Sequence, residues 1–235
     1  MADAREQHRR DRATDPVPAA QHYFTPEPAV PSAPRRVELV LPDTRFHLET
    51  DRGVFSPNRI DAGTKLLLLE DPLRDELSPN APGRYGSSRT LVDLGCGYGA
   101  IALTLARRHP DATIWAVDVN ERALALCRAN AAALGLANVV VGREDELSEL
   151  GAGGAVSAVY SNPPIRVGKA ALQDLLDRWA ARLAPGRPLL LVVRRDLGAE
   201  SLERWLAERG WAPTRLAARA GYRVLQARPC PGEAS

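Results

Sequence analysis

Short apolar runs and amphipathic stretches alternate along the chain from residue 89 onward. The apolar runs indicate buried strands, and the stretches with apolar residues three or four positions apart indicate helices. We expect strands at 90–94, 113–117, 138–142, 155–160 and 188–193, helices near 100–108, 120–134, 170–183 and 199–209, and two final strands at about 213–219 and 222–228. This order predicts an α/β fold in which helices cover both faces of a mostly parallel sheet. A ligand is expected at the carboxyl ends of the strands, near the topological switch point.

The region before this alternation has a different pattern. V-E-L-V-L and R-F-H-L-E-T flank P-D-T within residues 36–55, which predicts a β-hairpin. Asp61 can then cap a helix that ends before Pro72. The segment 73–88 is rich in Pro, Gly and Ser and is expected to be a loop. We divide the chain into a tail, an N-terminal extension, a core and a C-terminal end, at 1–34, 35–88, 89–228 and 229–235.

The tail, residues 1–34, mixes Arg, Asp and Ala and then places six prolines close together. Such a segment buries little and cannot form regular structure, so we expect disorder there and a flexible end at 229–235. The alternative is an arm whose four arginines contact RNA phosphates. Interspersed acidic residues weaken that alternative.

Composition narrows the class of protein. The chain has 235 residues, of which 45% are hydrophobic, enough for a substantial buried core. The net charge of +2 is too small to indicate a nucleic-acid-binding protein by itself. The three cysteines and four histidines lack metal-ligand spacing, so we expect no metal. There is no signal-peptide pattern and no apolar run near the roughly 20 residues that span a bilayer, so we expect a cytoplasmic protein.

A glycine-rich turn joins the first core strand to the first core helix. The stretch from Leu91 to Gly99 reads L-V-D-L-G-C-G-Y-G, with Asp93 in the strand and Gly95 and Gly97 in the turn. Glycine permits unusual backbone angles and lets a ligand lie against the main chain, and a helix start offers free N–H groups. The turn therefore predicts a cofactor site.

The second core strand, T-I-W-A-V-D, ends in Asp118. The turn has the spacing G-x-G-x-G, which fits poorly with the G-x-G-x-x-G of NAD sites. A carboxylate at the end of this strand can accept hydrogen bonds from both hydroxyls of a ribose, which favours another nucleoside. The alternative is that Asp118 only caps the next helix, although Asn120 can cap that helix itself.

Together, D-L-G-C-G-Y-G, A-V-D-V-N and S-N-P-P resemble the motifs of class I S-adenosylmethionine-dependent methyltransferases. The resemblance implies a Rossmann-like, seven-stranded sheet and S-adenosylmethionine as cofactor. It implies that the glycine turn contacts the methionine end of the cofactor, and that Glu144 or Asp145 accepts from the adenine amino group. A solvated charge run is the alternative for these two acids. The residues expected at the cofactor from these motifs are Asp93, Gly95, Cys96, Gly97, Gly99, the ribose ligand Asp118, Val119 against the adenine face, Asn120, Glu144 and Asp145.

S-N-P-P follows the strand predicted at 155–160. Pro163 and Pro164 cannot continue a strand or helix, so they hold Asn162 in a rigid loop. As a bare tetrapeptide this is a turn, but beside such a glycine turn it resembles the signature of methyltransferases that act on planar amino nitrogens. Such a nitrogen is a poor nucleophile because its lone pair is delocalised. The Asn162 side-chain oxygen and the Pro163 carbonyl can accept its two hydrogens and aim the lone pair, with no strong base.

The residues beyond N-P-P are the expected substrate contacts. In methyltransferases with the N-P-P signature, an aromatic residue commonly follows the two prolines. Ile165 stands in its place here and loses base stacking worth about 1–3 kcal/mol per base. Arg166 and Lys169 come next, and Arg194 and Arg195 follow the fifth predicted strand. Four cations at the carboxyl edge of the sheet suit phosphates, and ordinary solvated side chains are the alternative.

Over about 21–228, the chain resembles the methyltransferase small domain proteins through H-Y-F-T-P-E-P, G-V-F-S-P-N-R-I-D-A-G-T-K-L-L, S-N-P-P-I-R-V-G-K and G-Y-R-V-L. These proteins are similar to the catalytic half of small-subunit ribosomal RNA guanine-N2 methyltransferases. The resemblance implies methylation of guanine N2 in 16S ribosomal RNA, with that RNA or the small ribosomal subunit as partner. It also implies that residues 35–88 cover the cofactor, with candidates Phe55, Asp61, Gly63 and Thr64.

Two other functions stay open. One is an N-methyltransferase acting on a protein glutamine or a small-molecule amine. The other is a non-catalytic RNA-binding or assembly protein with a vestigial cofactor fold. The motifs leave the modified nucleotide and the oligomeric state undetermined.

Overall fold

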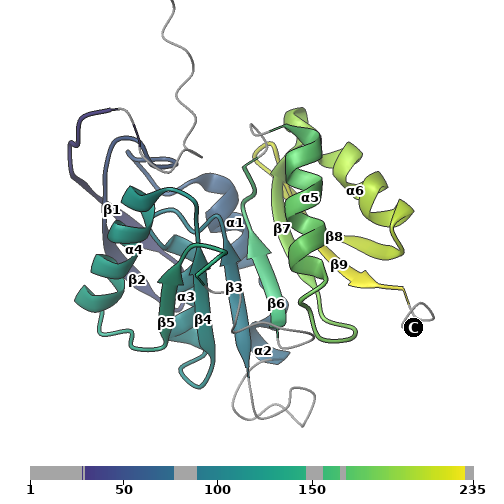
Figure 1. Ribbon diagram of the computed structural model, residues 1–235, viewed down its shortest axis with the longest axis horizontal. Coiled ribbons are helices and arrows are strands. Elements are labelled where there is room, and N and C mark those ends of the chain that lie inside the picture. Colours follow the sequence, from purple (N-terminus) through teal and green to yellow (C-terminus); the bar gives the residue numbers. More distant parts are fainter. Residues whose placement is uncertain (1–27, 29, 77–88, 147–155, 165–167, 231–235) are drawn as a thin grey trace, which may run out of the picture.

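The computed structural model describes residues 28, 30–76, 89–146, 156–164 and 168–230. Seven strands form one sheet in the order β5-β4-β3-β6-β7-β9-β8 (Figure 1). The strand β9 runs antiparallel to both neighbours, and the other paired strands of the sheet are parallel. The predicted seven-stranded, mostly parallel sheet is confirmed. Its strands are β3 (Thr90–Leu94), β4 (Thr113–Val117), β5 (Val139–Gly142), β6 (Val156–Ser161), β7 (Leu189–Arg194), β8 (Trp211–Arg219) and β9 (Tyr222–Pro229).

Helices cover both faces of the sheet. On one face lie α1 (Ala62–Leu69), α3 (Ala100–Arg108) and α4 (Glu121–Ala133), and on the other α5 (Lys169–Ala180) and α6 (Ala199–Glu208). Side chains alternate along each strand, so Leu91 of β3 joins the core under the first three helices and Val92 joins the core under α5 and α6. Because both faces of the central strands are buried, β3, β4, β6 and β7 are mostly apolar runs in the sequence.

The N-terminal hairpin packs on the face that carries α3 and α4. Strands β1 (Arg35–Val40) and β2 (Arg45–Thr50) pair antiparallel, and their apolar side chains enter that core. Asn130 of α4 donates to the carbonyl of Glu49 (2.9 Å) and accepts from its N–H (2.8 Å). The same Asn130 amide nitrogen donates to the carbonyl of Tyr98 (2.9 Å) in the glycine turn. One side chain therefore joins the hairpin, α4 and the glycine turn.

The segment predicted as a loop begins with a short helix. Residues Leu73–Glu76 form α2, and the Leu73 N–H donates to Asp71 Oδ1 (3.1 Å). The loop prediction is wrong for these four residues because the Asp71 side chain, which accepts from the Leu73 N–H, allows a new helix to begin directly after Pro72, which we took as a helix stop. Residues 77–88 lie outside the described ranges.

Two element ends differ from the expected ones by more than one residue. The helix α5 ends at Ala180 rather than near 183, because Leu183 already forms a parallel bridge with Val156. The strand β8 begins at Trp211, ahead of the expected residue 213. Pro213 is accommodated in it because β8 is an edge strand, where a missing N–H is tolerated.

The predicted disordered ends, 1–34 and 229–235, fall mostly outside the described residues. None of the helices in the described ranges is long and apolar enough to cross a membrane. In the same ranges, no three His, Cys, Asp or Glu side chains gather as a group that could hold a metal ion.

Candidate active site

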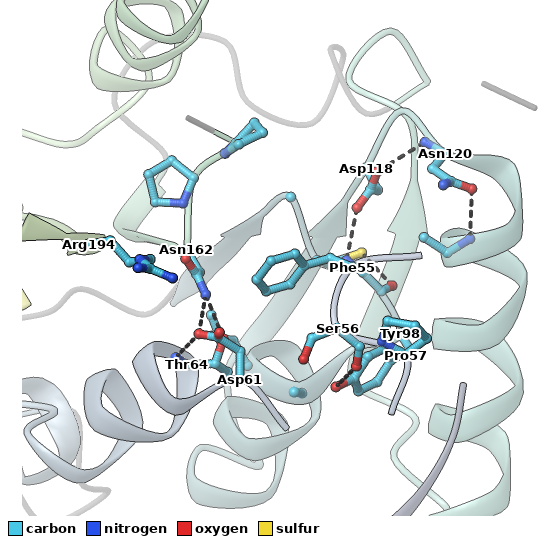
Figure 2. A pocket seen from close by; sticks show the side chains of 18 of the residues that line it. Phe55, Ser56, Pro57, Asp61, Thr64, Tyr98, Asp118, Asn120, Asn162 and Arg194 are labelled. Atoms are coloured by element: carbon cyan, nitrogen blue, oxygen red, sulfur yellow. Dashed lines mark hydrogen bonds between the residues drawn. The ribbon is translucent and has the colours of Figure 1, made fainter. Parts of the chain in front are cut away.

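A cavity of about 310 Å³ lies at the carboxyl ends of β3, β4, β6 and β7. The strand β3 lies between β4 and β6, where the strand order reverses, so the cavity occupies the expected switch point. The segment 55–57 and the first turn of α1 border it on the remaining side (Figure 2). The lining residues are Phe55, Ser56, Pro57, Asp61, Thr64, Gly95, Cys96, Gly97, Tyr98, Ala100, Ile101, Asp118, Asn120, Ala123, Asn162, Pro163, Pro164, Arg194, Leu197 and Tyr222.

The glycine turn is bonded to the end of β4. The N–H groups of Gly95 and Cys96 donate to the carbonyl of Val117 (2.8 and 2.9 Å), and the Gly97 N–H donates to Asp118 Oδ2 (2.9 Å). Gly99 has a φ of 98°, and a Cβ there would lie 2.8 Å from Cys127 Sγ, so only glycine fits at the start of α3. These bonds fix the main chain that faces the cavity.

Asp118 lies in the cavity wall with part of its hydrogen-bonding capacity unused. Its Oδ1 accepts from the Asn120 N–H (3.0 Å), and its Oδ2 accepts from Gly97. A carboxylate offers about four lone-pair sites, so both oxygens can accept further donors. Burial raises the pKa of Asp118, and the N–H donors of Asn120 and Gly97 oppose that rise. The Asn120 side chain caps α4 by accepting from Arg122 and Ala123, so capping does not require Asp118.

Asp93 is buried behind the turn. Its Oδ2 accepts from the Ala102 N–H (2.8 Å) in the first turn of α3, while its Oδ1 is buried and has no hydrogen-bond partner among the described residues. Burial raises the pKa of Asp93 to about 7, and the nearby charge of Asp118 adds to the rise. Neither Asp93 nor Gly99 is among the residues that line the cavity. The turn therefore contributes Gly95, Cys96 and Gly97 to the wall, and Asp93 supports it from behind.

The space in front of the turn fits a nucleoside cofactor with a cationic amino-acid end. A Cβ on Gly97 would meet no described atom within 4 Å, and one on Gly95 would meet only Pro164 Cδ at 3.9 Å. A ligand can thus lie directly on the main chain. The open lone pairs of Asp118, which lines the cavity, supply acceptors for the hydroxyl donors of such a cofactor, and the Asp93 oxygen without a described partner lies buried behind the turn. The residues present fit S-adenosylmethionine.

The residues expected around the adenine line a second hollow. It begins at the residue after Asp118 and is lined by Val119, Arg143, Glu144, Asp145 and Arg182. Val119 is 43% exposed, as a residue packing on a ligand face requires. The two acids already have partners, since Glu144 lies 3.5 Å from Arg182 and Asp145 lies 3.2 Å from Arg143. Adenine would share these carboxylates with arginines.

Asn162 is held by a hydrogen-bond network on the opposite wall (Figure 2). Its Nδ2 donates to Asp61 Oδ2 (2.9 Å) and to Thr64 Oγ1 (3.0 Å). The Tyr222 hydroxyl donates to the other Asp61 oxygen (2.9 Å), and the Thr64 N–H donates to Asp61 Oδ2 (3.0 Å). With its nitrogen so engaged, the Asn162 amide keeps its oxygen as an acceptor, for which the described part of the chain supplies no donor. The two prolines after it also line the cavity.

The expected substrate cations are only partly gathered at the cavity. Arg194 lines it and forms an ion pair of 2.7 Å with the aspartate two residues later. Arg195 and Lys169 are exposed and outside the lining. Ile165 and Arg166 lie outside the described residues. Of the expected cations, the described residues thus place only Arg194 in the lining of the cavity.

Sequence reasoning missed several lining residues. Ser56, Pro57 and Tyr98 stand in quoted motifs that gave them no role, and Leu197 stands in none. Their position at the cavity depends on how loops fold over the sheet. The Tyr98 hydroxyl donates to the Ser56 carbonyl (3.5 Å), and burial raises the pKa of Tyr98. Tyr222 belongs to G-Y-R-V-L, which we noted only as part of the resemblance. Its antiparallel strand brings it beside α1, which spacing alone does not reveal.

Comparison with known proteins decides the family. A family model described as "Methyltransferase small domain" matches residues 45–226. The chain belongs to the methyltransferase small domain family. It is accordingly an S-adenosylmethionine-dependent methyltransferase. The predicted family and the predicted cofactor are both confirmed. The family match includes β2, the glycine turn, N-P-P and Tyr222 within one continuous segment.

Relatives within this family differ in length. YbxB of Bacillus subtilis (strain 168) is 31% identical over 209 residues, which are 89% of this chain and 98% of YbxB. Ribosomal RNA small subunit methyltransferase C of Pseudomonas aeruginosa (strain LESB58) is 34% identical over 207 residues, which are 86% of this chain and 57% of that protein. The chain therefore spans little more than half the length of this ribosomal RNA methyltransferase.

A solved structure shows the same fold. The Thermus thermophilus 16S rRNA N2 G1207 methyltransferase, in complex with AdoMet and guanosine, has a TM-score of 0.66 and 29% identity. The match covers 86% of this chain and 52% of that one. The similar region is again about half of a longer protein.

Proposed function

We propose that this protein transfers a methyl group from S-adenosylmethionine to N2 of a guanine in the 16S ribosomal RNA of the small subunit. The orientation of Asn162 carries the proposal. Its NH2 group donates to Asp61 and Thr64, which leaves the amide oxygen as an acceptor in the cavity. An exocyclic amine with two hydrogens complements an acceptor of this kind.

The catalytic residues act by orientation. When bound, S-adenosylmethionine supplies a methyl group on a positively charged sulfur. The Asn162 oxygen and the Pro163 carbonyl accept the two amine hydrogens, and Pro164 keeps the loop rigid. The nitrogen lone pair is thereby aimed across the cavity at the glycine turn. Positioning in a site with little water supplies most of the rate enhancement, and the amine releases its proton to water after transfer.

We propose a cofactor position that follows from the two hollows. The main chain at Gly95, Cys96 and Gly97 holds the methionine end, supported by Asp93 and Gly99 from behind, and Asp118 binds the ribose hydroxyls. Adenine lies in the second hollow, against Val119, with Glu144 or Asp145 as acceptor. Asn120 and Thr64 are the remaining residues proposed to contact the cofactor, since both line the cavity. Phe55, Asp61 and Thr64 support the role of residues 35–88 as the cover of this site.

The RNA substrate is proposed from the relatives and from the mouth of the cavity. A relative is named a ribosomal RNA small subunit methyltransferase, and the solved neighbour contains guanosine. Lys169, Arg194 and Arg195, with Arg166, suit phosphates, and Ile165 suits one face of the base. A base within paired RNA leaves the helix at a cost of a few kcal/mol. This substrate implies a cytoplasmic enzyme.

The test is methyl transfer to unmodified small ribosomal subunits. Labelled S-adenosylmethionine is expected to place label on guanine N2 of 16S ribosomal RNA, located by mass spectrometry. Asn162→Ala is expected to lower kcat by about 10²-fold or more while cofactor binding persists. Label in RNA that is unchanged in Asn162→Ala would refute the catalytic assignment.

Other results point to the other candidate functions. Label in a protein or small-molecule fraction, with none in RNA, identifies an N-methyltransferase with a different acceptor. Salt-dependent RNA binding without turnover identifies a vestigial, non-catalytic protein. Either result replaces the ribosomal RNA proposal.

A further inference from the structure

Three distant parts of the chain meet at the carboxylate of Asp61, before the first turn of α1. Tyr222 of β9 donates to Oδ1 at 2.9 Å, and Asn162 after β6 donates to Oδ2 at 2.9 Å. The Thr64 N–H also donates to Oδ2, at 3.0 Å, so Asp61 is the N-cap of α1. The cap fixes the position of the carboxylate, and the carboxylate is then shared with the proposed catalytic amide.

The chemistry of this contact decides which end of the Asn162 amide faces the cavity. An amide oxygen and an NH2 group have nearly the same shape, so side-chain rotation can exchange them. A carboxylate only accepts hydrogen bonds, and it therefore selects the NH2 group of Asn162. Thr64 Oγ1, at 3.0 Å from the same nitrogen, can donate or accept and does not select. Without Asp61, the amide can turn its NH2 group toward the substrate.

We propose that Asp61, held by Tyr222, is a positioning residue that keeps the Asn162 oxygen directed at the substrate. The inference rests on the proposed function and narrows its substrate class to acceptors that carry N–H hydrogens. If the Asn162 amide were flipped, its NH2 group would face the N–H groups of the amine, and no hydrogen bond could form between them. Asp61 thus favours the productive orientation of Asn162 over the unproductive one by its bond to the amide nitrogen.

A glycine in α1 supports the same arrangement independently. A Cβ on Gly63 would lie 2.5 Å from two ring carbons of Tyr222. No real Cβ makes such a contact, so any other residue there displaces the Tyr222 ring from α1. Gly63 therefore provides the room that lets the Tyr222 hydroxyl reach Asp61.

The first test removes the carboxylate and keeps the cap. Serine is also a good N-cap, but its short side chain cannot reach Asn162 and Tyr222 together. Asp61→Ser is expected to lower kcat on unmodified small subunits by about 10²-fold, as misplacement of a catalytic group does. The cofactor Kd is expected to change far less than kcat, because the main effect of Asp61 is exerted through Asn162. Tyr222→Phe is expected to give a smaller loss, about tenfold. The matched control is Asp177→Ser, which removes an exposed ion pair with Arg209 and is expected to leave kcat unchanged.

A double-mutant cycle separates positioning from folding. Because Asp61 acts through Asn162, Asp61→Ser is expected to cause no further loss of kcat in an Asn162→Ala background. An equal loss in both backgrounds, or no loss in wild-type background, would overturn the inference. If wild-type protein itself fails to methylate 16S ribosomal RNA, the proposed function fails instead, and the next measurement still tests Asp61.

That measurement needs no substrate. The Asn162 side-chain NH2 signals are assigned by NMR from their disappearance in Asn162→Ala, and their exchange with water is measured. Wild-type protein and Asp177→Ser are expected to show slow exchange, because both hydrogens are engaged. In Asp61→Ser, exchange is expected to rise by about tenfold or more. Equal exchange in wild type and Asp61→Ser would show that Asp61 does not hold the amide.

Discussion

Asp93 is the residue whose environment most directly affects stability through pH. It is 1% exposed, one of its oxygens has no partner among the described residues, and burial raises its pKa to about 7. A carboxyl whose pKa is higher in the folded state than in the unfolded state stabilises the fold when protonated. The contribution of Asp93 to the free energy of unfolding is fully present below the pKa that this carboxyl has in the unfolded state. It is lost as the pH rises to about 7, the pKa in the folded state.

We predict that Asp93→Asn removes this pH dependence. Between about pH 4 and 7 the unfolding free energy of the wild type is expected to fall relative to the variant, by up to about 1.4 kcal/mol per pH unit. Asn keeps an oxygen for the Ala102 N–H, so the bond to α3 survives. Urea unfolding of both proteins at several pH values measures the difference. Parallel curves would show that Asp93 has an ordinary pKa in the folded state.

At the scale of elements, Asn130 connects parts that the sequence presents separately. It is 2% exposed and bonds to both main-chain polar groups of Glu49 and to the Tyr98 carbonyl. Removing it leaves the hairpin without this attachment to α4 and the glycine turn without a support. Effects on stability and on cofactor binding are therefore expected together.

We predict that Asn130→Ala lowers the unfolding free energy by roughly 2–4 kcal/mol, since buried main-chain groups lose their partners. The cofactor Kd is expected to rise several-fold, because Tyr98 lies in the glycine turn. Asn138→Ala is the control: its amide bonds to the carbonyls of Ala106, His109 and Ala112, away from the cavity. It is expected to lose stability with unchanged cofactor affinity, as measured by urea unfolding and titration calorimetry. Equal Kd values in all three proteins would contradict a role for Asn130 at the site.

The core elements were predictable from local patterns: each buried strand is a short apolar run, and each amphipathic helix has apolar residues three or four positions apart. The glycine turn and Asp118 were also predictable, since strand ends bring their residues to one edge of the sheet. Tyr222 was not, because its contact with Asp61 depends on an antiparallel strand that inserts between β7 and β8. The helix α2 was missed because we took Pro72 as a helix stop, whereas the Asp71 side chain accepts from the N–H of Leu73 and allows a new helix to begin directly after it.

At the scale of the whole molecule, the cavity proposed to hold the cofactor contacts most of the sheet. The ends of β3, β4, β6 and β7, the start of α1 and Tyr222 of β9 all line one cavity. Binding there stabilises only the folded chain, so it is expected to raise the temperature of a single cooperative unfolding transition.

We predict a shift of about 5–10 °C at a 100-fold excess of S-adenosylmethionine over its Kd. Such an excess is worth about 2.7 kcal/mol, and a chain of this size gains about 2–4 °C per kcal/mol. Asp118→Ala at the same concentration is expected to show little shift, because ribose binding is lost. Differential scanning calorimetry gives both values. An undiminished shift in the variant would remove Asp118 from the cofactor site.

The two bonds to Asp61 also set an order of events during synthesis. Asn162 lies 101 residues and Tyr222 lies 161 residues further along the chain than their shared partner. Contacts of such high sequence separation form late in folding, after local helices and adjacent strands. The last strand, β9, must leave the ribosome and insert between β7 and β8 before Tyr222 can donate to Asp61. The complete set of bonds at Asp61 therefore forms only in a chain whose C-terminal strand has been made and paired.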